Sequence, residues 1–324
     1  MNGERLPSAA QGRLRLPSKP RLEVPGFSPF YSTDLGDAYL ADSLAVLKAL
    51  PDSSINAVVT SPPYALHFKK EYGNADKADY VAWFVEFGKE MFRVLADDGS
   101  LILNIGGSYN PGAPTRSLYH YKLLIELVDT VGFSLAQECF WYNPAKMPVP
   151  AEWVTVRRIR LRDSVEYVWW LSKTAWPKAN NRHVLRPYSK DMERLNRKGL
   201  SAKIRPSGHN ITSGFSGIAA GGSIPPNVVE EESAVEMLRF GNNAANDPYT
   251  LRCKAAGLKI HPARFPAALP EFFLKLVTDE GDLVLDPFAG SNTTGAVAEM
   301  LDLRWIAVDN VAEYLEASKN RFPC

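Results

Sequence analysis

Apolar residues follow two different periods along this chain, and the alternation of the two predicts an α/β fold. Short continuous apolar runs, typical of strands buried on both faces, lie at residues 55–60 and 101–107. Apolar residues at helical spacing lie at 45–50, 79–95 and 117–133. Because strands that alternate with helices at these lengths are joined by crossovers, the pattern predicts a parallel sheet covered on both faces.

A strand–turn–helix–strand unit near the C-terminus repeats this pattern. It reads DLVLDPFAGSNTTGAVAEMLDLRWIAVDN, with one strand ending at Asp286 and the next at Asp309. An acid about 20 residues beyond a glycine-containing turn is the arrangement that binds ribose hydroxyls in nucleotide-binding folds. The unit therefore predicts a nucleotide-like ligand at the carboxyl ends of these strands, against the alternative of a plain turn with incidental acids.

The turn of this unit narrows the choice of ligand. A phosphate-binding loop needs Lys and a hydroxyl residue after its second glycine, but Gly295 is followed by Ala296 and Val297. The GxGxxG pattern of dinucleotide sites is also missing from FAGSNTTG. A nucleoside cofactor without a phosphate chain, such as S-adenosylmethionine, fits the remaining features.

The tetrapeptide Ser61-Pro62-Pro63-Tyr64 directly follows the apolar run 55–60. Proline has no N–H, so the prolyl carbonyls are fixed groups that accept hydrogen bonds, and Ser61 adds a hydroxyl. This set suits an exocyclic amine on a planar base, because acceptors that take its N–H groups leave its lone pair free for methyl transfer. Tyr64 would stack on the base, which must first leave the DNA duplex.

The middle of the chain breaks the α/β alternation. Residues 145–210 hold 15 Lys plus Arg against 5 Asp plus Glu, a local balance of +10 in a chain whose net charge is +1. Aromatic residues are interleaved with these charges, which favours a polyanionic partner over a plain solvated surface. Residues 1–30 are rich in Pro and Arg without a hydrophobic period, and we expect a flexible tail.

Composition excludes several other classes. No run approaches the roughly 18 apolar residues of a membrane span, and the N-terminus lacks the apolar core of a secretory signal. The three cysteines, Cys139, Cys253 and Cys324, are scattered, so neither a disulfide framework nor a metal site is predicted. We expect a cytoplasmic protein.

Three segments together resemble the amino-methylating DNA methyltransferases of the β type. They are SPPY at 61–64, HPARFPAALPEFF at 261–273 and DPFAG at 286–290. The order, SPPY before DPFAG, is similar to the circularly permuted arrangement of that family. The resemblance implies a Rossmann-like S-adenosylmethionine-dependent methyltransferase domain with an inserted target-recognition region.

The same resemblance implies a division of the chain. Residues 31–144 would form the catalytic half, residues 145–258 the DNA target-recognition region, and residues 259–324 the cofactor-binding half.

Roles for individual residues also come from the resemblance. The predicted catalytic residues are Ser61, Pro62, Pro63 and Tyr64. The predicted cofactor-binding residues are Asp42, Phe265, Pro266, Asp286, Pro287, Phe288, Gly290, Asn292, Thr293 and Asp309. Within this set, the DPFAGSNT turn would line the methionine end of the cofactor and Asp309 would hold its ribose. Asp42 lies in the segment that reaches the adenine, and Phe265 and Pro266 lie in the segment that closes over the cofactor.

Two residues depart from the family pattern. Tyr64 stands where we expect Phe, which keeps a stacking face, and Asn104 stands where we expect Asp. The second departure favours polarisation of the amine by acceptors alone over a carboxylate relay through Ser61.

Ser61 also bears on the target base. The Ser form of the tetrapeptide is similar to that of N4-cytosine enzymes, whereas N6-adenine enzymes usually carry Asp or Asn there. Covalent attack on cytosine C5 requires a cysteine, usually after proline, and the pair Pro323-Cys324 stands at the chain end. We therefore predict a site-specific methyltransferase that forms N4-methylcytosine on a flipped-out base of double-stranded DNA.

Two alternatives stay open, an N6-adenine enzyme of the same fold and a catalytically inactive DNA-binding protein. The resemblance further implies a bacterial restriction-modification system. A cognate restriction endonuclease would then be a functional rather than a physical partner, and the enzyme would work at the nucleoid in the bacterial cytoplasm.

Overall fold

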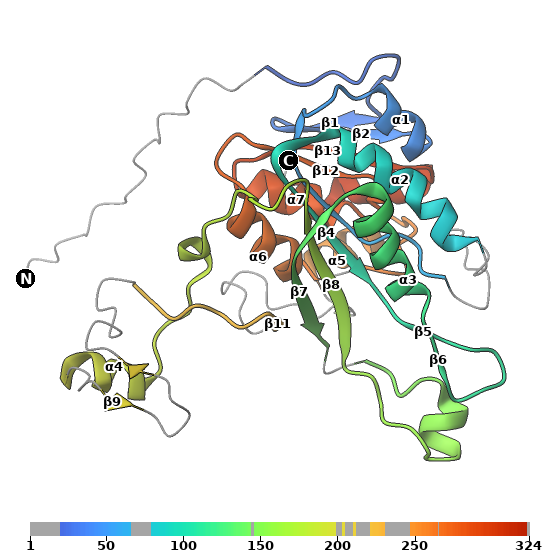
Figure 1. Ribbon diagram of the computed structural model, residues 1–324. Helices are drawn as coiled ribbons and strands as arrows, with labels where there is room; N and C mark the ends of the chain where they lie inside the picture. The colour runs from blue at the N-terminus through green and yellow to red at the C-terminus, as the bar shows by residue number, and fades with distance from the viewer. Residues whose placement is uncertain are drawn as a thin grey trace, which may run out of the picture.

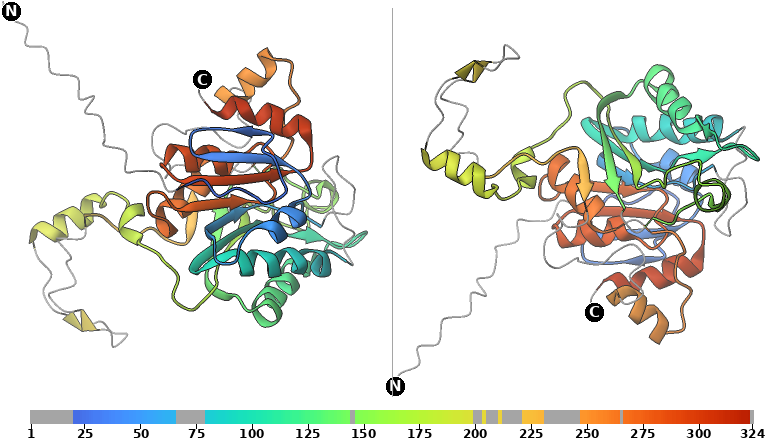
Figure 2. Two further views of the ribbon diagram at one scale, coloured as in Figure 1. Left: turned by 90° about the horizontal axis from the view of Figure 1, so that it is seen from above. Right: turned by 90° about the horizontal axis from the view of Figure 1, so that it is seen from below.

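The computed structural model describes residues 20–65, 79–143, 146–198, 203–204, 210–211, 221–230, 247–264 and 266–322. Within these residues a nine-stranded sheet is covered by helices on both faces, which gives a three-layer α/β/α domain (Figures 1 and 2). Phe265 and Cys324 lie outside the described residues.

The strands run through most of the chain. They are β1 (Tyr31–Ser32), β2 (Gly36–Leu40), β3 (Ile55–Thr60), β4 (Leu95–Ile105), β5 (Ser108–Tyr109), β6 (Arg116–Ser117), β7 (Ser134–Tyr142), β8 (Val165–Ser172), β9 (Lys203–Ile204), β10 (Asn210–Ile211), β11 (Val228–Glu230), β12 (Leu283–Asp286) and β13 (Arg304–Asp309). The order in the main sheet is β1-β2-β13-β12-β3-β4-β8-β7-β11.

Helices connect and cover these strands. The α-helices are α1 (Ser43–Ala49), α2 (Tyr80–Val94), α3 (Tyr119–Glu126), α4 (Lys190–Lys198), α5 (Pro248–Ala255), α6 (Ala268–Val277), α7 (Thr293–Met300) and α8 (Ala312–Ser318). Short π-helical segments are η1 (Leu127–Val131) and η2 (Glu152–Val156), and 3-10 turns are η3 (Asn181–Val184) and η7 (Lys319–Arg321). No helix among the described residues has the length and apolar character needed to cross a membrane.

Five central strands are parallel, and this decides where a site can form. Strands β2, β13, β12, β3 and β4 lie side by side in that order and pair in parallel with one another, so their carboxyl ends lie along one edge. The C-terminal strands β12 and β13 are inserted between β2 and β3, as a circularly permuted order requires. Ligands of open α/β sheets bind at such an edge.

The prediction of a parallel sheet holds for this centre and for the outer pair β7 and β11, but not for the whole sheet. Strand β1 is antiparallel to β2, and β8 is antiparallel to both β4 and β7. The sheet is therefore mixed, because β7 and β8 are joined by a loop that returns along the sheet rather than by a helical crossover.

Alternate residues of the central strands build two separate cores. Ile55 and Val58 of β3 face the core that contains α1, α2 and α3, and Ala57 and Val59 face the core that contains α6 and α7. In β12, Leu283 and Leu285 face the first core and Val284 the second. Since both faces of each strand are buried, these segments appear in the sequence as continuous apolar runs.

The predicted elements of this framework are confirmed with small shifts. The strand at 55–60 is β3, the helix at 79–95 is α2, and the last unit is β12, α7 and β13. The helix predicted at 117–133 is α3 continued by η1, and it ends where Gly132 adopts a φ of 102°.

Strand β8 belongs to the main sheet although its residues fall within the predicted recognition region. It lies within residues 145–258, yet it sits in the main sheet between β4 and β7. Its VEYVWWLS sequence contributes Val168 to one core and Trp169 and Leu171 to the other. Burial on both faces removes the polar alternation that would have marked this segment as a half-exposed strand.

Residues 20–30, the last part of the predicted tail, contact the α/β domain. Val24 is 3% exposed and packs in the core beside α1 and α2. Arg21 forms an ion pair of 2.9 Å with Asp37 of β2. Residues 1–19 of the predicted tail lie outside the described residues.

Two parts of the predicted recognition region extend from the domain. One contains η2 and lies beside the β5–β6 hairpin, and the other carries α4 and the β9–β10 pair on the opposite side (Figure 1). Helix α4 has no buried residue.

Candidate active site

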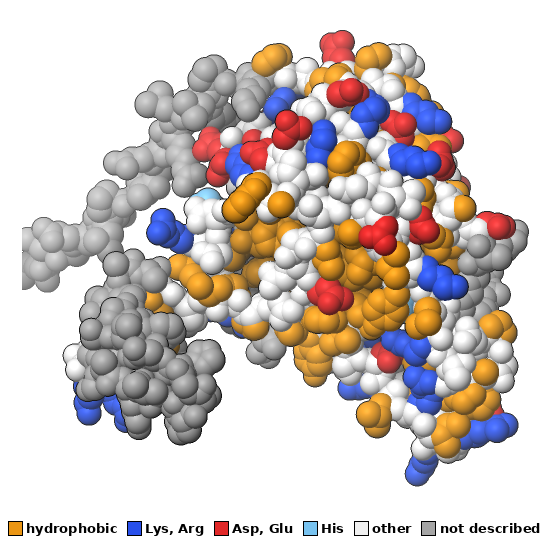
Figure 3. Space-filling model, in the orientation of Figure 1, with side chains coloured by type: hydrophobic (Ala, Val, Ile, Leu, Met, Phe, Trp, Pro, Cys, Tyr) orange, Lys and Arg blue, Asp and Glu red, His pale blue; other side chains and the backbone are white. Residues whose placement is uncertain are grey.

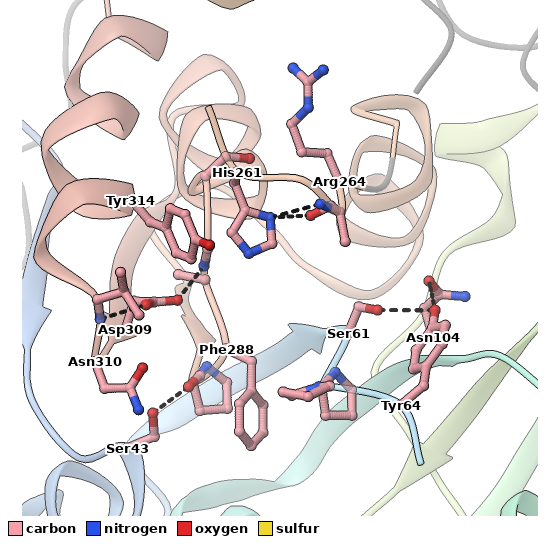
Figure 4. A pocket seen from close by; sticks show the side chains of 18 of the residues that line it. Ser43, Ser61, Tyr64, Asn104, His261, Arg264, Phe288, Asp309, Asn310 and Tyr314 are labelled. Atoms are coloured by element: carbon pink, nitrogen blue, oxygen red, sulfur yellow. Dashed lines mark hydrogen bonds between the residues drawn. The ribbon is translucent and has the colours of Figure 1, made fainter. Parts of the chain in front are cut away.

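A cavity of about 980 Å³ opens at the carboxyl edge of the parallel strands. Side chains from the ends of β2, β3, β4, β12 and β13 line it. Asp309 and Asn310 lie on one side, Ser61, Tyr64 and Asn104 lie on the other, and Phe288 lies between them (Figure 4). The two predicted motifs, far apart in the sequence, therefore share one cavity.

The turn between β12 and α7 forms one wall of this cavity. Gly290 has a φ of 52°, and a Cβ there would lie 3.1 Å from the ring of His261. Glycine is needed at this point both for the left-handed backbone and for the close approach. The adjacent Phe288 ring packs against Phe87 with a centroid distance of 5.0 Å.

Asp309 fastens this turn to the end of β13. One of its carboxylate oxygens accepts a hydrogen bond from the backbone N–H of Gly290 at 2.8 Å, and the other accepts one from Val311 at 2.9 Å. Burial raises the pKa of Asp309, while these backbone donors oppose that rise. The carboxylate lines the cavity and has capacity left to accept a further hydrogen bond from a ribose hydroxyl.

Asp286 does not reach the cavity in this structure. It is 1% exposed, and its carboxylate accepts hydrogen bonds from Thr60 and Thr294, both at 2.7 Å, and from the N–H of Phe288 at 3.1 Å. Burial raises its pKa to about 6. The side chain joins β3, β12 and α7 and thereby fixes the turn.

Asn292, like Asp286, is buried and holds the turn in place. It is fully buried, caps α7 by accepting the N–H of Gly295 at 3.0 Å, and donates to the hydroxyl of Tyr31 at 2.9 Å. Its φ of 51° is left-handed, a conformation that Asn tolerates better than most residues. Thr293, next to it, does line the cavity.

The remaining predicted cofactor residues divide into two groups. Asp42, Pro287 and Phe288 line the cavity, and Ser43 ties their loops together by donating to the carbonyl of Pro287 at 2.5 Å. Pro266 is buried at the start of α6 and is absent from the lining. The residues just before it, 261–264, do line the cavity, so this segment reaches the site through different side chains.

The lining fits S-adenosylmethionine. The carboxylate of Asp309 suits ribose hydroxyls, and the rings of Trp83, Phe87 and Phe288 offer planar apolar surface. The close backbone approach at Gly290 leaves room that a side chain would fill. These features match a nucleoside cofactor rather than a pyrophosphate-containing one, since the turn FAGSNTTG lacks the GxGxxG glycines that let a backbone approach a pyrophosphate.

The Ser61-Pro62-Pro63-Tyr64 segment forms the opposite wall. All four residues line the cavity. The hydroxyl of Tyr64 lies 3.2 Å from that of Ser61, and its ring packs against Gly106, where a Cβ would approach to 2.5 Å. Burial and the charge of Glu166 hold the pKa of Tyr64 well above its usual range.

Several lining residues were not predicted. Trp83 and Phe87 belong to the helical period of α2, which identifies them as apolar without showing that they reach a cavity. Glu166 comes from β8, a strand that the sequence pattern did not reveal. Tyr314 of α8 packs on His261 with a centroid distance of 4.4 Å.

The fold and this site define the class of Rossmann-like methyltransferases with a permuted motif order. A sequence model described as DNA methylase matches residues 55–320. The type II methyltransferase M.PvuII of Proteus hauseri is 48% identical over 300 residues, which are 92% of this chain and 86% of that protein. The type II methyltransferase M.ScaI of Streptomyces caespitosus is 25% identical over 90% of this chain and 83% of that protein. The chain belongs to the DNA methylase family.

Solved structures agree with this assignment. The structure of the PvuII DNA methyltransferase, described as cytosine-N4-specific, superimposes with a TM-score of 0.73 and 41% identity, covering 92% of this chain and 90% of that chain. A putative DNA modification methylase of Thermus thermophilus, solved in complex with S-adenosyl-L-methionine, shares the fold at a TM-score of 0.52 and 19% identity, covering 88% of this chain and 91% of that chain. The predicted fold class and family resemblance are confirmed, and S-adenosyl-L-methionine is the methyl donor of this family.

Proposed function

We propose that this enzyme transfers a methyl group from S-adenosylmethionine to the exocyclic N4 of cytosine in double-stranded DNA. The observation that carries the proposal is the set of acceptors at the end of β3, in the cavity that Asp309 and Phe288 also line. The similarity to M.PvuII, at 48% identity, supports cytosine N4 as the target atom.

The chemistry follows from what the two walls offer. When bound, S-adenosylmethionine supplies a methyl group on a positively charged sulfur. The carbonyls of Pro62 and Pro63 and the hydroxyl of Ser61 accept the N–H groups of the amine and leave its lone pair available. The side-chain N–H₂ of Asn104 donates one hydrogen bond to the backbone carbonyl of Tyr167 at 3.1 Å, and its oxygen accepts from the hydroxyl of Tyr64 at 3.1 Å.

The target base has to leave the duplex to reach these acceptors, because its amine is paired inside the helix. We propose that the ring of Tyr64 stacks on the flipped base. The Tyr64 ring packs closely against Gly106, which fixes the position of the ring before the base binds.

The segment around η2, with its exposed arginines, is the proposed DNA surface, and we call it the basic projection. Arg157, Arg158 and Arg162 are exposed on the segment around η2, and blue side chains gather on that part of the molecule in Figure 3. The ion pair of Arg116 with Asp163, at 2.5 Å, braces this segment against the β5–β6 hairpin. We propose that the arginines contact phosphates, since phosphate contacts position a protein on DNA.

For the cofactor, we propose that Asp309 holds the ribose and that Asp42 lies near the adenine. Phe288, Gly290 and Thr293 would line the methionine end, while Asp286 and Asn292 would act by shaping the turn. The predicted contact of Phe265 lies outside the described residues.

We also propose a setting for the enzyme. The curated relatives described above are type II methyltransferases of bacteria. Modification of DNA in a bacterial cytoplasm, alongside a cognate restriction endonuclease that need not bind this chain, is consistent with that group.

Nucleoside mass spectrometry on unmethylated DNA tests the proposal. DNA incubated with the protein and S-adenosylmethionine should contain N4-methylcytosine, whereas N6-methyladenine would contradict the assignment of the target base. Ser61→Ala should lower turnover at least ~10-fold with little change in cofactor affinity. Ser54→Ala, at the other end of β3, is the matched control and should behave as wild type.

A further inference from the structure

The hydroxyl of Tyr64 meets side chains from three separate parts of the chain. It lies 3.2 Å from Ser61 Oγ, 3.1 Å from Asn104 Oδ1 of β4, and 3.0 Å from Glu166 Oε2 of β8. Glu166 also lines the cavity. A carboxylate therefore stands one hydroxyl away from the serine of the tetrapeptide.

The direction of these hydrogen bonds follows from the donors available. An ionised Glu166 can only accept, and Asn104 turns its oxygen towards Tyr64 because its N–H₂ donates to Tyr167. The single proton of Tyr64 must then point towards one of these two acceptors. The oxygen of Tyr64 is left to accept from Ser61, so the lone pairs of Ser61 stay free for the substrate amine.

Glu166 is itself held in place. Its second oxygen, Oε1, accepts from Lys146 at 3.0 Å, and its side chain is 14% exposed. The ion pair orients the carboxylate, and the small exposed part leaves a route for a proton to solvent. Tyr64 stays protonated, because burial and the nearby carboxylate raise its pKa well above the usual range.

We propose that Glu166 is a positioning residue of the methyl-transfer reaction, acting on Ser61 through the hydroxyl of Tyr64. This inference rests on the proposed function. The family pattern leads us to expect a carboxylate at position 104 of β4, where this chain has Asn. In this enzyme the carboxylate comes from the neighbouring antiparallel strand, and the hydroxyl of Tyr64 connects it to Ser61.

The same chain of groups can remove the proton that methylation releases. Transfer forms the new N–C bond and breaks the S–C bond of the donor, which leaves one proton too many on the amine nitrogen. That proton passes to Ser61 Oγ, the serine proton passes to Tyr64 Oη, and the tyrosine proton passes to Glu166. The carboxylic acid then returns its proton to water.

Isosteric variants separate this role from a structural one. In Glu166→Gln, Lys146 holds the amide oxygen, so the N–H₂ group faces Tyr64 and reverses the hydrogen bond. Tyr64→Phe removes the connecting hydroxyl and keeps the ring. Asn104→Asp places a carboxylate on β4, at a position whose side-chain oxygen lies 3.1 Å from the Tyr64 hydroxyl in the wild type. Glu138→Gln makes the same chemical change at an exposed position of β7 and is the matched control.

The measurements are the single-turnover methylation rate, the equilibrium affinity for DNA without cofactor, and the melting temperature. We expect Glu166→Gln and Tyr64→Phe each to lower the rate about 10-fold or more, with DNA affinity unchanged. The double variant Tyr64→Phe/Glu166→Gln should be no slower than Tyr64→Phe alone. Asn104→Asp, added to Glu166→Gln, should recover most of the rate that Glu166→Gln loses.

Additive losses in the double variant, or a Glu166→Gln rate equal to that of Glu138→Gln, would overturn the inference. A lower melting temperature that accounts for the slower rate, without rescue by Asn104→Asp, would also overturn it. Each of these outcomes presupposes that the wild-type enzyme is active and forms N4-methylcytosine. Failure of the wild type to form that product would refute the proposed function instead.

Discussion

Replacing Asp286 by Asn should stabilise the protein at neutral pH, and the gain should shrink in acid. Asp286 is buried at the junction of β3, β12 and α7, and burial raises its pKa from the ordinary 3.8 to about 6. Between these two values the folded state binds more protons than the unfolded state. The stability of the wild type therefore falls as the pH rises through this window.

The size of the effect follows from the shift. At about 1.36 kcal/mol per pKa unit, ionisation of Asp286 should cost the folded state about 2.5 kcal/mol more at about pH 7.5 than at about pH 4. An Asn side chain does not ionise, so the variant does not lose this stability, and the amide can keep the hydrogen-bond partners of Asp286. Its oxygen can accept from Thr60 and Phe288, and its N–H₂ can donate to Thr294, whose own proton then goes to the carbonyl of Val59 at 3.2 Å.

Urea unfolding followed by tryptophan fluorescence at several pH values between about 4 and 7.5 measures this difference. The free energy of unfolding of Asp286→Asn, relative to wild type, should rise by about 2.5 kcal/mol over that range. Asp34→Asn changes an exposed carboxylate in the same way and should show no such trend. A difference between Asp286→Asn and wild type that does not depend on pH would refute the reasoning, because Asp286 would then titrate normally in the folded protein.

Three further predictions concern the cofactor and DNA. Asp309→Ala should weaken S-adenosylmethionine binding about 10-fold or more, by calorimetry, since charged hydrogen bonds are lost; unchanged affinity would exclude the ribose role. Gly106→Ala places a Cβ 2.5 Å from the ring of Tyr64 and should slow methylation about 10-fold or more at unchanged cofactor affinity; a normal rate would show that the ring position is unimportant. DNA affinity should fall steeply with salt, with a log–log slope of about −5 if roughly six phosphates are contacted, and a flat dependence would exclude the basic projection as the DNA surface.

Local patterns in the sequence were sufficient to predict the framework and the two motifs. Strand β3, helix α2 and the unit from β12 to β13 depend on apolar periods and a glycine turn, which are properties of short segments. The tetrapeptide after β3 and the acid at the end of β13 could be assigned to a strand edge for the same reason. Family resemblance then supplied a chemistry for both.

Which of these residues meet one another depends on the tertiary fold. Thr60 and Asp286, 226 residues apart, are hydrogen-bonded because β12 lies beside β3 in the sheet. Glu166 reaches Tyr64 because β8 runs antiparallel to β4, a pairing hidden by burial of β8 on both faces. Contacts of this kind depend on strand order and register, which arise from packing between distant segments, and no local pattern in the sequence records them.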